Sequence, residues 1–295
     1  MSTEPRLPYL VDTAWLAGRL NDPDLVVLDC TTRIVPDMAT VYRTEPCRGS
    51  FEAGHVPGAQ FVDVQQDLSD NTHRWKFMLP QTADFAAAME RLGVSDTSHA
   101  VLYSTGDPWW ATRVWWLLHV FGFERSSVLD GGFQAWQREG RSLETGPGRA
   151  RPCGTLTARL QPALVAGREE VLAAIGDGTV CMLNARLPSQ FEGKDGNNYG
   201  RAGRIPGSFN VPSASLMDPK TNRYRPEPEL QERFAAAAPD GKRVIAYCGH
   251  GIAASASVFA LAMLGHPNVA LYDASLSEWA ADETLPIAVG AQTGA

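Results

Sequence analysis

The sequence has 295 residues, of which 44% are hydrophobic and 20% charged, a composition ordinary for a globular protein and a length that fits two domains. Its net charge of −7 argues against a protein whose main task is to bind nucleic acid or an anionic membrane. The first ten residues lack the pattern of a secretory signal, and no apolar run approaches the ~18 residues of a membrane helix. We therefore expect a cytoplasmic protein with neither a nucleic-acid nor a membrane partner.

The chain has five cysteines, and no two of them are spaced as Cys-Xaa-Xaa-Cys. The odd number and the spacing argue against a disulfide framework and against a four-cysteine zinc site, so we expect no metal. In a reducing cytoplasm most of these residues are expected to be small buried hydrophobic side chains. They are Cys30, Cys47, Cys153, Cys181 and Cys248.

The predicted elements alternate short apolar strands with helical segments, which indicates an α/β fold. In the first half they are helix 12–20, strand 25–29, helix 84–92 and strand 100–104. In the second half they are helix 168–175, strand 180–184, helix 228–237, strand 244–248 and helix 253–264. Because the strands are short and apolar throughout, each half is predicted to form a mostly parallel sheet with helices on both faces.

The same features recur in the same order in the two halves, which indicates a duplication. Gly-His-Val-Pro-Gly-Ala at 54–59 returns as Gly-Arg-Ile-Pro-Gly-Ser at 203–208, and each half closes with an Asp and a Trp six residues apart. We expect an N-terminal domain at 1–145, a linker rich in Gly and Pro at 146–164 and a C-terminal domain at 165–295.

Cys248 differs from the other cysteines because it stands at the predicted carboxyl end of a strand, where parallel sheets bind their ligands. The first half has Ser104 at the matching position. Gly249 and Gly251 allow the backbone N–H groups after Cys248 to turn inward, and a helix follows at once. Such a pocket binds anions and lowers the pKa of a thiol, so Cys248 is predicted to be a thiolate nucleophile.

Together these motifs resemble the tandem-domain thiosulfate/3-mercaptopyruvate sulfurtransferases of the rhodanese superfamily, over nearly the whole chain. The resemblance implies two rhodanese-like domains, of which the N-terminal one is non-catalytic because Ser104 replaces the cysteine. The segments that carry it are 54–59, 61–63, 68–70, 77–80, 113–116, 129–133, 203–208 and 248–253.

The resemblance also implies a double displacement that moves a sulfane sulfur from a small anionic donor to a thiophilic acceptor. Cys248 attacks the outer sulfur of thiosulfate or 3-mercaptopyruvate and becomes a persulfide, which cyanide or a thiol then discharges; no cofactor is implied. Arg186 matches a family arginine that binds the donor, and its fork suits a sulfonate or a carboxylate. The loop expected to cradle the persulfide consists of Gly249, His250, Gly251, Ile252 and Ala253.

His250 is a second candidate for binding the donor, and an unperturbed histidine would be half charged at about pH 6.5. The loop Cys-Gly-His-Gly-Ile-Ala matches neither the thiosulfate type nor the mercaptopyruvate type of the family. Gln65 and Phe77 stand where mercaptopyruvate-type members carry an Asp and a His that work with a loop Ser, so the choice of donor stays open. Candidate residues of the cleft around the site are Arg74, Lys76 and Tyr199.

Two other functions use a cysteine in such a loop. A cysteine phosphatase needs an Arg six residues after its Cys, and that residue here is Ala254, so phosphatase activity is not expected. A persulfide relay protein would use the same chemistry and pass the sulfur to a thioredoxin-like or other sulfur-acceptor protein, with poor turnover on small acceptors. Turnover with cyanide or a small thiol distinguishes the relay from the enzyme.

Overall fold

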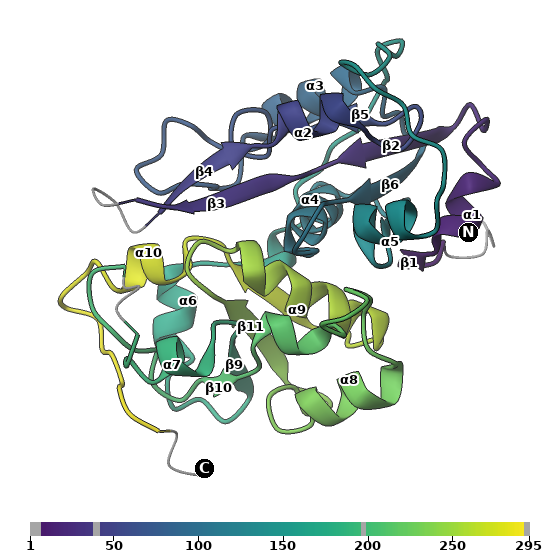
Figure 1. The fold of residues 1–295 in the computed structure, drawn as a ribbon. Helices are drawn as coiled ribbons and strands as arrows, with labels where there is room; N and C mark the ends of the chain where they lie inside the picture. Colours follow the sequence, from purple (N-terminus) through teal and green to yellow (C-terminus); the bar gives the residue numbers. More distant parts are fainter. Residues whose placement is uncertain (1–6, 38–41, 196–198, 292–295) are drawn as a thin grey trace.

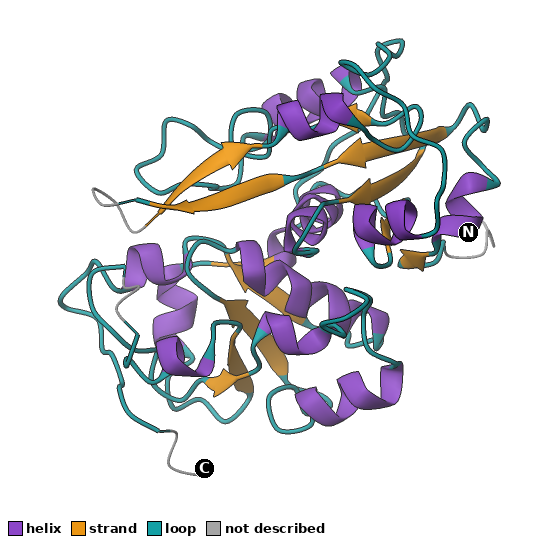
Figure 2. Ribbon diagram, viewed as in Figure 1, coloured by secondary structure: helices purple, strands orange, loops and turns teal. Residues whose placement is uncertain are grey.

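The computed structural model describes residues 7–37, 42–195 and 199–291, which form two α/β domains that lie against each other (Figure 1). Each domain contains a five-stranded sheet. Helices cover both faces of each sheet (Figure 2). The α/β fold predicted from the sequence is therefore confirmed.

All strands of the N-terminal sheet are parallel, in the order β1-β7-β6-β2-β5. The central strands β2 and β6 are buried almost throughout, which explains why they appear in the sequence as continuous apolar runs. The bounds are β1 Leu10–Val11, β2 Leu25–Asp29, β5 Gln60–Phe61, β6 His99–Tyr103 and β7 Ser126–Leu129.

The C-terminal sheet is also parallel, in the order β8-β12-β11-β9-β10. When each strand is matched to its equivalent in the other half, the two sheets have the same topology, so the predicted duplication is confirmed. The bounds are β8 Val165–Ala166, β9 Val180–Asn184, β10 Phe209–Asn210, β11 Arg243–Tyr247 and β12 Val269–Tyr272.

The strands that matter for the site lie where the sequence predicts them. Strands 25–29 and 180–184 have the predicted bounds, whereas those predicted at 100–104 and 244–248 begin and end one residue earlier. This shift places Ser104 and Cys248 immediately beyond the carboxyl ends of β6 and β11.

All five predicted helices are present, although three are shorter than predicted. The helix predicted at 12–20 ends at Ala17, where Gly18 caps it, and the one predicted at 253–264 begins at Ile252. None of the described helices is both long and apolar enough to span a membrane. The α-helices are α1 Thr13–Ala17, α2 Arg48–Ala53, α3 Thr82–Arg91, α4 Trp109–Val120, α5 Gly132–Arg138, α6 Arg168–Ala173, α7 Pro188–Phe191, α8 Glu227–Phe234, α9 Ile252–Met263 and α10 Ser275–Trp279.

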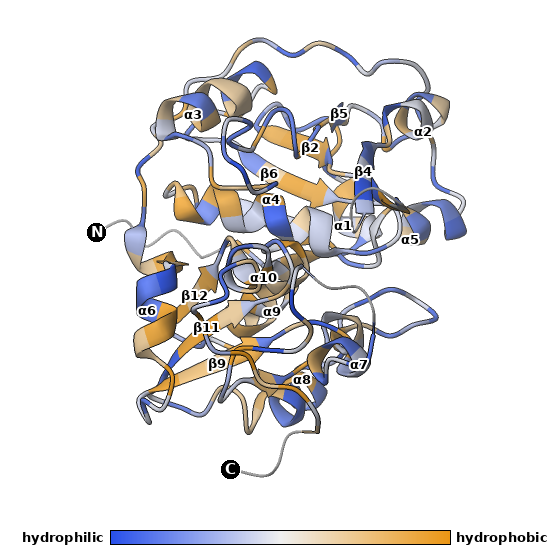
Figure 3. Ribbon diagram, turned by 90° about the vertical axis from the view of Figure 1, so that its left-hand side faces the viewer, coloured by the Kyte–Doolittle hydropathy of each residue, from blue (hydrophilic) through white to orange (hydrophobic). Residues whose placement is uncertain are grey.

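Helices α4 and α9 pack against each other between the two domains (Figure 3). Thr112 and Ser255, at equivalent positions of the two helices, share a hydrogen bond of 2.9 Å. Close by, the rings of Trp115 and Phe259 meet edge to face with centroids 4.8 Å apart. Both helices are buried on nearly all sides, which explains why their sequences are apolar nearly all round rather than amphipathic.

The antiparallel hairpin of β3 (Thr32–Pro36) and β4 (Tyr42–Pro46) in the N-terminal domain was not predicted from the sequence. It projects from the N-terminal sheet and ends over the C-terminal domain near α10 (Figure 1). Residues 43–50 are polar, so a search for apolar runs finds no strand there. The available signal is the β-branched composition of Thr32-Arg33-Ile34-Val35, which is typical of a strand.

Candidate active site

Cys248 begins a tight loop that joins β11 to α9. Its backbone N–H donates to Ser275 Oγ at 3.1 Å, and its carbonyl accepts from the N–H of Leu276 at 3.3 Å. The side chain is only 3% exposed. The start of α10 therefore anchors the loop of residues 248–251, hereafter the active-site loop, and the thiol lies inside the protein.

The active-site loop presents several unoccupied backbone donors. Within the part of the chain that the structure describes, the N–H groups of Gly249, His250, Gly251 and Ile252 have no acceptor. Gly251 adopts a left-handed conformation with φ of +71° and leads directly into the N-terminus of α9. Successive free N–H groups at a helix N-terminus bind anions, as the sequence predicts.

The equivalent loop of the N-terminal domain is closed by its own residues. Ser104 Oγ donates to the carbonyl of Asp107 at 2.8 Å, and the N–H of Thr105 donates to Thr31 Oγ1 at 2.9 Å. The N–H equivalent to that of Gly249, which is free in the C-terminal domain, is therefore occupied here. The N-terminal loop lacks both the nucleophile and the full set of open N–H groups.

Arg186 occupies the position after β9 that Thr31 occupies after β2. The N–H of Arg186 donates to Asn184 Oδ1 at 2.9 Å, and that of Thr31 donates to Asp29 Oδ1 at the same distance. The two domains thus share this turn, but Thr31 carries a hydroxyl where Arg186 carries a guanidinium. Arg186 is 7% exposed, and burial lowers its pKa, while the charges of Cys248 and nearby tyrosines oppose this shift. The charge of Arg186, the predicted donor-binding residue, therefore interacts with that of Cys248.

Tyr199 lies directly on the backbone of Gly249. A Cβ atom at Gly249 would be 2.1 Å from the Tyr199 hydroxyl, so this contact requires glycine. The Arg186 guanidinium lies 5.4 Å from the centroid of the Tyr199 ring. Burial, and next the charge of Cys248, raise the pKa of Tyr199 to about 12, so the phenol stays protonated at neutral pH. Tyr199 thus packs against the active-site loop.

His250 is held by Tyr42, which the unpredicted hairpin carries across from the N-terminal domain. The Tyr42 hydroxyl and His250 Nδ1 are 2.6 Å apart, and the two rings meet edge to face. Burial, and to a smaller extent the charge of Lys76, lower the pKa of His250 to about 3. An imidazole with this pKa is neutral at physiological pH, so the half charge of an unperturbed histidine does not apply to His250.

A cavity of about 240 Å³, hereafter the mouth, lies between the two domains and reaches the active-site loop at His250. The exposed side chains of Arg74 and Lys76 flank it, with the Arg74 guanidinium 4.1 Å from the Trp75 ring centroid. The three predicted cleft residues therefore lie together, with two aromatic residues that the sequence did not single out. The lining residues are Tyr42, Arg74, Trp75, Lys76, Tyr199, His250 and Ser277.

Gln65 and Phe77 contribute no titratable group. Phe77 is fully buried with a positive φ of 62°, and its carbonyl accepts from the guanidinium of Arg113. Gln65 donates its side-chain amide to Asn71 Oδ1 at 2.8 Å. No described group of His, Cys, Asp and Glu residues is arranged to hold a metal ion.

The other cysteines differ from Cys248 in their surroundings. Cys30 and Cys181 are buried core residues, and burial raises the pKa of both thiols. Cys47 is half-buried and Cys153 is exposed in the predicted linker. Cys30 follows the central strand β2, but the next N–H, that of Thr31, is occupied by Asp29 Oδ1.

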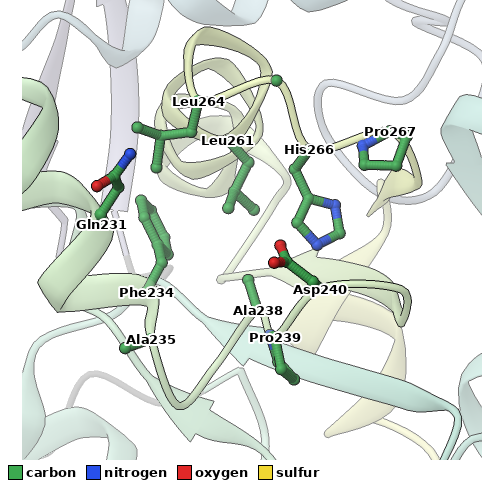
Figure 4. A pocket seen from close by; sticks show the side chains of 11 residues that line it. Gln231, Phe234, Ala235, Ala238, Pro239, Asp240, Leu261, Leu264, His266 and Pro267 are labelled. Atoms are coloured by element: carbon green, nitrogen blue, oxygen red, sulfur yellow. The ribbon is translucent and has the colours of Figure 1, made fainter.

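A second cavity, of about 350 Å³, lies in the C-terminal domain between α8 and the end of α9 (Figure 4). Phe234, Leu261 and Leu264 form its apolar side, and Asp240 and His266 lie at its other side. It shares no lining residue with the mouth beside His250.

Comparison with known proteins agrees with this geometry. A family model described as a rhodanese-like domain matches the chain twice, at residues 12–139 and 167–282. The chain is 35% identical over 283 residues to 3-mercaptopyruvate sulfurtransferase of Escherichia coli (strain K12), covering 95% of this chain and 97% of that protein. It is 33% identical over 282 residues to thiosulfate sulfurtransferase of Rattus norvegicus, covering 92% and 91%. The crystal structure of SseA from Escherichia coli matches with a TM-score of 0.80 at 33% identity, over 92% of this chain and 100% of that chain.

Proposed function

The chain belongs to the rhodanese family, and we propose that it is a sulfurtransferase in which Cys248 carries the transferred sulfur as a persulfide. The observation that carries this proposal is the active-site loop, where a buried cysteine at the end of β11 is followed by N–H groups without acceptors. A persulfide is an anion, and fixed N–H donors stabilise it without having to reorganise.

The proposed reaction has two steps. In the first, the Cys248 thiolate attacks the outer sulfur of thiosulfate, whose S–S bond breaks as sulfite leaves. With 3-mercaptopyruvate the C–S bond breaks instead, and the thiol proton of the donor passes to the carbon of the departing pyruvate. In the second step a nucleophilic acceptor, cyanide or a thiol, takes the outer sulfur and restores the thiolate.

The charges around the site favour a small anionic donor. Arg186 lies buried within the site, and Arg74 and Lys76 are exposed at its mouth. We assign Arg186 to the sulfonate or carboxylate of the donor, because a guanidinium can bond two oxygens of one group. We assign Arg74 and Lys76 to attracting the donor from solvent. The neutral His250 adds no positive charge.

The burial of Cys248 favours an enzyme with small acceptors over a persulfide relay. The thiol is 3% exposed, and Tyr199 and Tyr42 cover the active-site loop. Cyanide or a small thiol fits a mouth of about 240 Å³ more readily than a cysteine held on a protein surface. Delivery to a thioredoxin-like or other sulfur-acceptor protein is the second candidate, and it requires the hairpin to move aside.

In this proposal residues 165–295 form the catalytic domain and residues 1–145 a non-catalytic domain that supplies part of the mouth. The segment 146–164 joins them. A cytoplasmic location accords with the five free cysteines.

The proposal is tested by intact-mass spectrometry after separate incubation with thiosulfate and with 3-mercaptopyruvate. We expect the mass to increase by one sulfur atom and cyanide to reverse the increase. Cys248→Ser should gain no sulfur while its circular dichroism spectrum stays native, and the exposed-cysteine control Cys153→Ser should behave as wild type. Failure to take up sulfur from either donor would overturn the proposal, whereas uptake followed by slow discharge to cyanide would favour the relay.

A further inference from the structure

The contact between Tyr42 and His250 joins an N-terminal hairpin to the active-site loop of the other domain. The two residues are separated by 208 positions in the chain, yet their polar atoms are 2.6 Å apart. The same tyrosine ring lies 6.4 Å from the ring of Tyr199, edge to face. All three rings line the mouth.

The direction of this hydrogen bond decides which nitrogen of His250 carries the ring proton. Burial keeps the imidazole neutral and also raises the pKa of Tyr42 well above its ordinary value, so both partners are uncharged. A phenol O–H is a good donor, and the bare nitrogen of a neutral imidazole is a good acceptor. The Nδ1–H of a neutral imidazole can also donate to a phenol oxygen; when Tyr42 donates to Nδ1 instead, the ring proton of His250 lies on Nε2.

The second nitrogen of His250 is available to a ligand. Within the described chain, Nε2 has no hydrogen-bond partner, although the residue lines the mouth. With its proton on Nε2, the ring offers an N–H donor beside the free backbone donors of Gly249 and Gly251. If the proton were on Nδ1 instead, Nε2 would present a lone pair, which repels the oxygens of an anion.

We propose that Tyr42 is a positioning residue of the sulfur-transfer site, which holds His250 in the tautomer whose Nε2–H donates to an oxygen of the anionic sulfur donor. The N-terminal domain thereby sets a binding group in the C-terminal active site. The choice of donor as ligand rests on the function proposed above, whereas the tautomer is a property of the resting protein. The two parts are therefore tested separately.

The tautomer is tested by 15N NMR of protein labelled at histidine, without any donor present. His250→Gln identifies the signals of His250 among the six histidines. We expect Nε2 to be protonated and Nδ1 unprotonated in the wild type, and a mixture of tautomers in Tyr42→Phe. A proton on Nδ1 in the wild type, or an unchanged spectrum in Tyr42→Phe, would overturn the proposal even if the protein transfers sulfur normally.

The role in binding is tested by steady-state kinetics. We expect Tyr42→Phe to raise the donor KM roughly 2- to 10-fold, the effect of one hydrogen bond, with little change in kcat. His250→Gln keeps an N–H donor near the position of Nε2 and should retain more activity than His250→Ala. Tyr224→Phe, a change at the buried domain interface away from the mouth, is the matched control and should behave as wild type.

A double-mutant cycle separates positioning from an independent effect of Tyr42. Because Tyr42 is proposed to act through the imidazole, Tyr42→Phe should have no further effect on KM in a His250→Ala background. If the two changes multiply instead, Tyr42 acts independently of His250 and the proposal is wrong. If neither donor charges Cys248 while the NMR result holds, the proposed function fails and the tautomer assignment stands.

Discussion

Arg113 in α4 and Asp273 at the end of β12 form a buried ion pair between the two domains, with Nη1 and Oδ1 2.5 Å apart. The other oxygen of Asp273 accepts from the N–H of Leu79 in the N-terminal domain at 2.8 Å. A Cβ atom at Gly251 would be 2.8 Å from Asp273 and 3.0 Å from Arg113. The active-site loop therefore rests directly on the ion pair that fastens the domains together.

Breaking this pair should destabilise the protein and disturb the active-site loop. Asp273→Asn leaves the Arg113 guanidinium buried without its counter-charge, which costs about 3–5 kcal/mol of unfolding free energy. Urea denaturation measures this change, and kcat should fall because the loop loses its support. Glu229→Gln is the control, because Glu229 pairs with Arg225 at the surface and such pairs are worth at most about 1 kcal/mol. A similarly small effect of Asp273→Asn would contradict this account.

Arg186→Ala should weaken binding of the donor. Loss of charge-assisted hydrogen bonds worth about 1.5–3 kcal/mol corresponds to a KM increase of roughly 10- to 100-fold. Arg186→Lys keeps the charge but loses the two-pronged guanidinium, so its KM should lie between those of the wild type and Arg186→Ala. The control is Arg149→Ala, since the Arg149 side chain is 83% exposed and lies in the predicted linker. An unchanged KM for every donor would exclude the proposed role of Arg186.

Gly249→Ala should impair the site by displacing Tyr199. The added methyl group would lie 2.1 Å from the Tyr199 hydroxyl, far inside van der Waals contact, so the ring must move. We expect sulfur transfer to fall roughly 10-fold or more, since a misplacement of about 1 Å can cost that much. Tyr199→Ala in the same chain should restore part of the loss. If the double variant is no better than Gly249→Ala, the clash is not the cause.

The repeat allowed much of this architecture to be predicted from the sequence. Asp130 and Asp273, recognised as equivalent residues, each accept a backbone N–H from the opposite domain, that of Tyr224 at 2.9 Å and that of Leu79 at 2.8 Å. The tryptophans six residues later, Trp136 and Trp279, also make equivalent contacts, because each indole N–H donates to a backbone carbonyl at 2.8 Å. Local sequence patterns and the internal repeat are sufficient to predict such features.

The Tyr42 contact could not be predicted in the same way. It joins residues 208 positions apart through a hairpin that, among the residues the structure describes, only the N-terminal domain has, so neither the periodicity nor the repeat contains it. The charge state of His250 was missed for the same reason, since it depends on burial beneath a segment from the other domain. Contacts between domains require the relative position of the domains, which one sequence does not supply.

The burial of neutral His250 should make stability depend on pH. Its pKa is about 3 in the folded protein and about 6.5 in the unfolded chain, so only the unfolded chain binds the proton between these values. Stability is therefore lost as the pH falls below about 6.5, by about 1–2 kcal/mol at pH 5 from this residue. The groups that face the imidazole are Tyr42, Tyr199 and Lys76, and burial raises the pKa of both tyrosines, so they stay protonated over this range. Urea unfolding of wild type and His250→Gln at pH 8 and pH 5 isolates the effect, because other titrating groups cancel in the difference. We expect the variant to gain about 1–2 kcal/mol relative to wild type on going from pH 8 to pH 5, and a difference that does not change with pH would mean that His250 titrates normally.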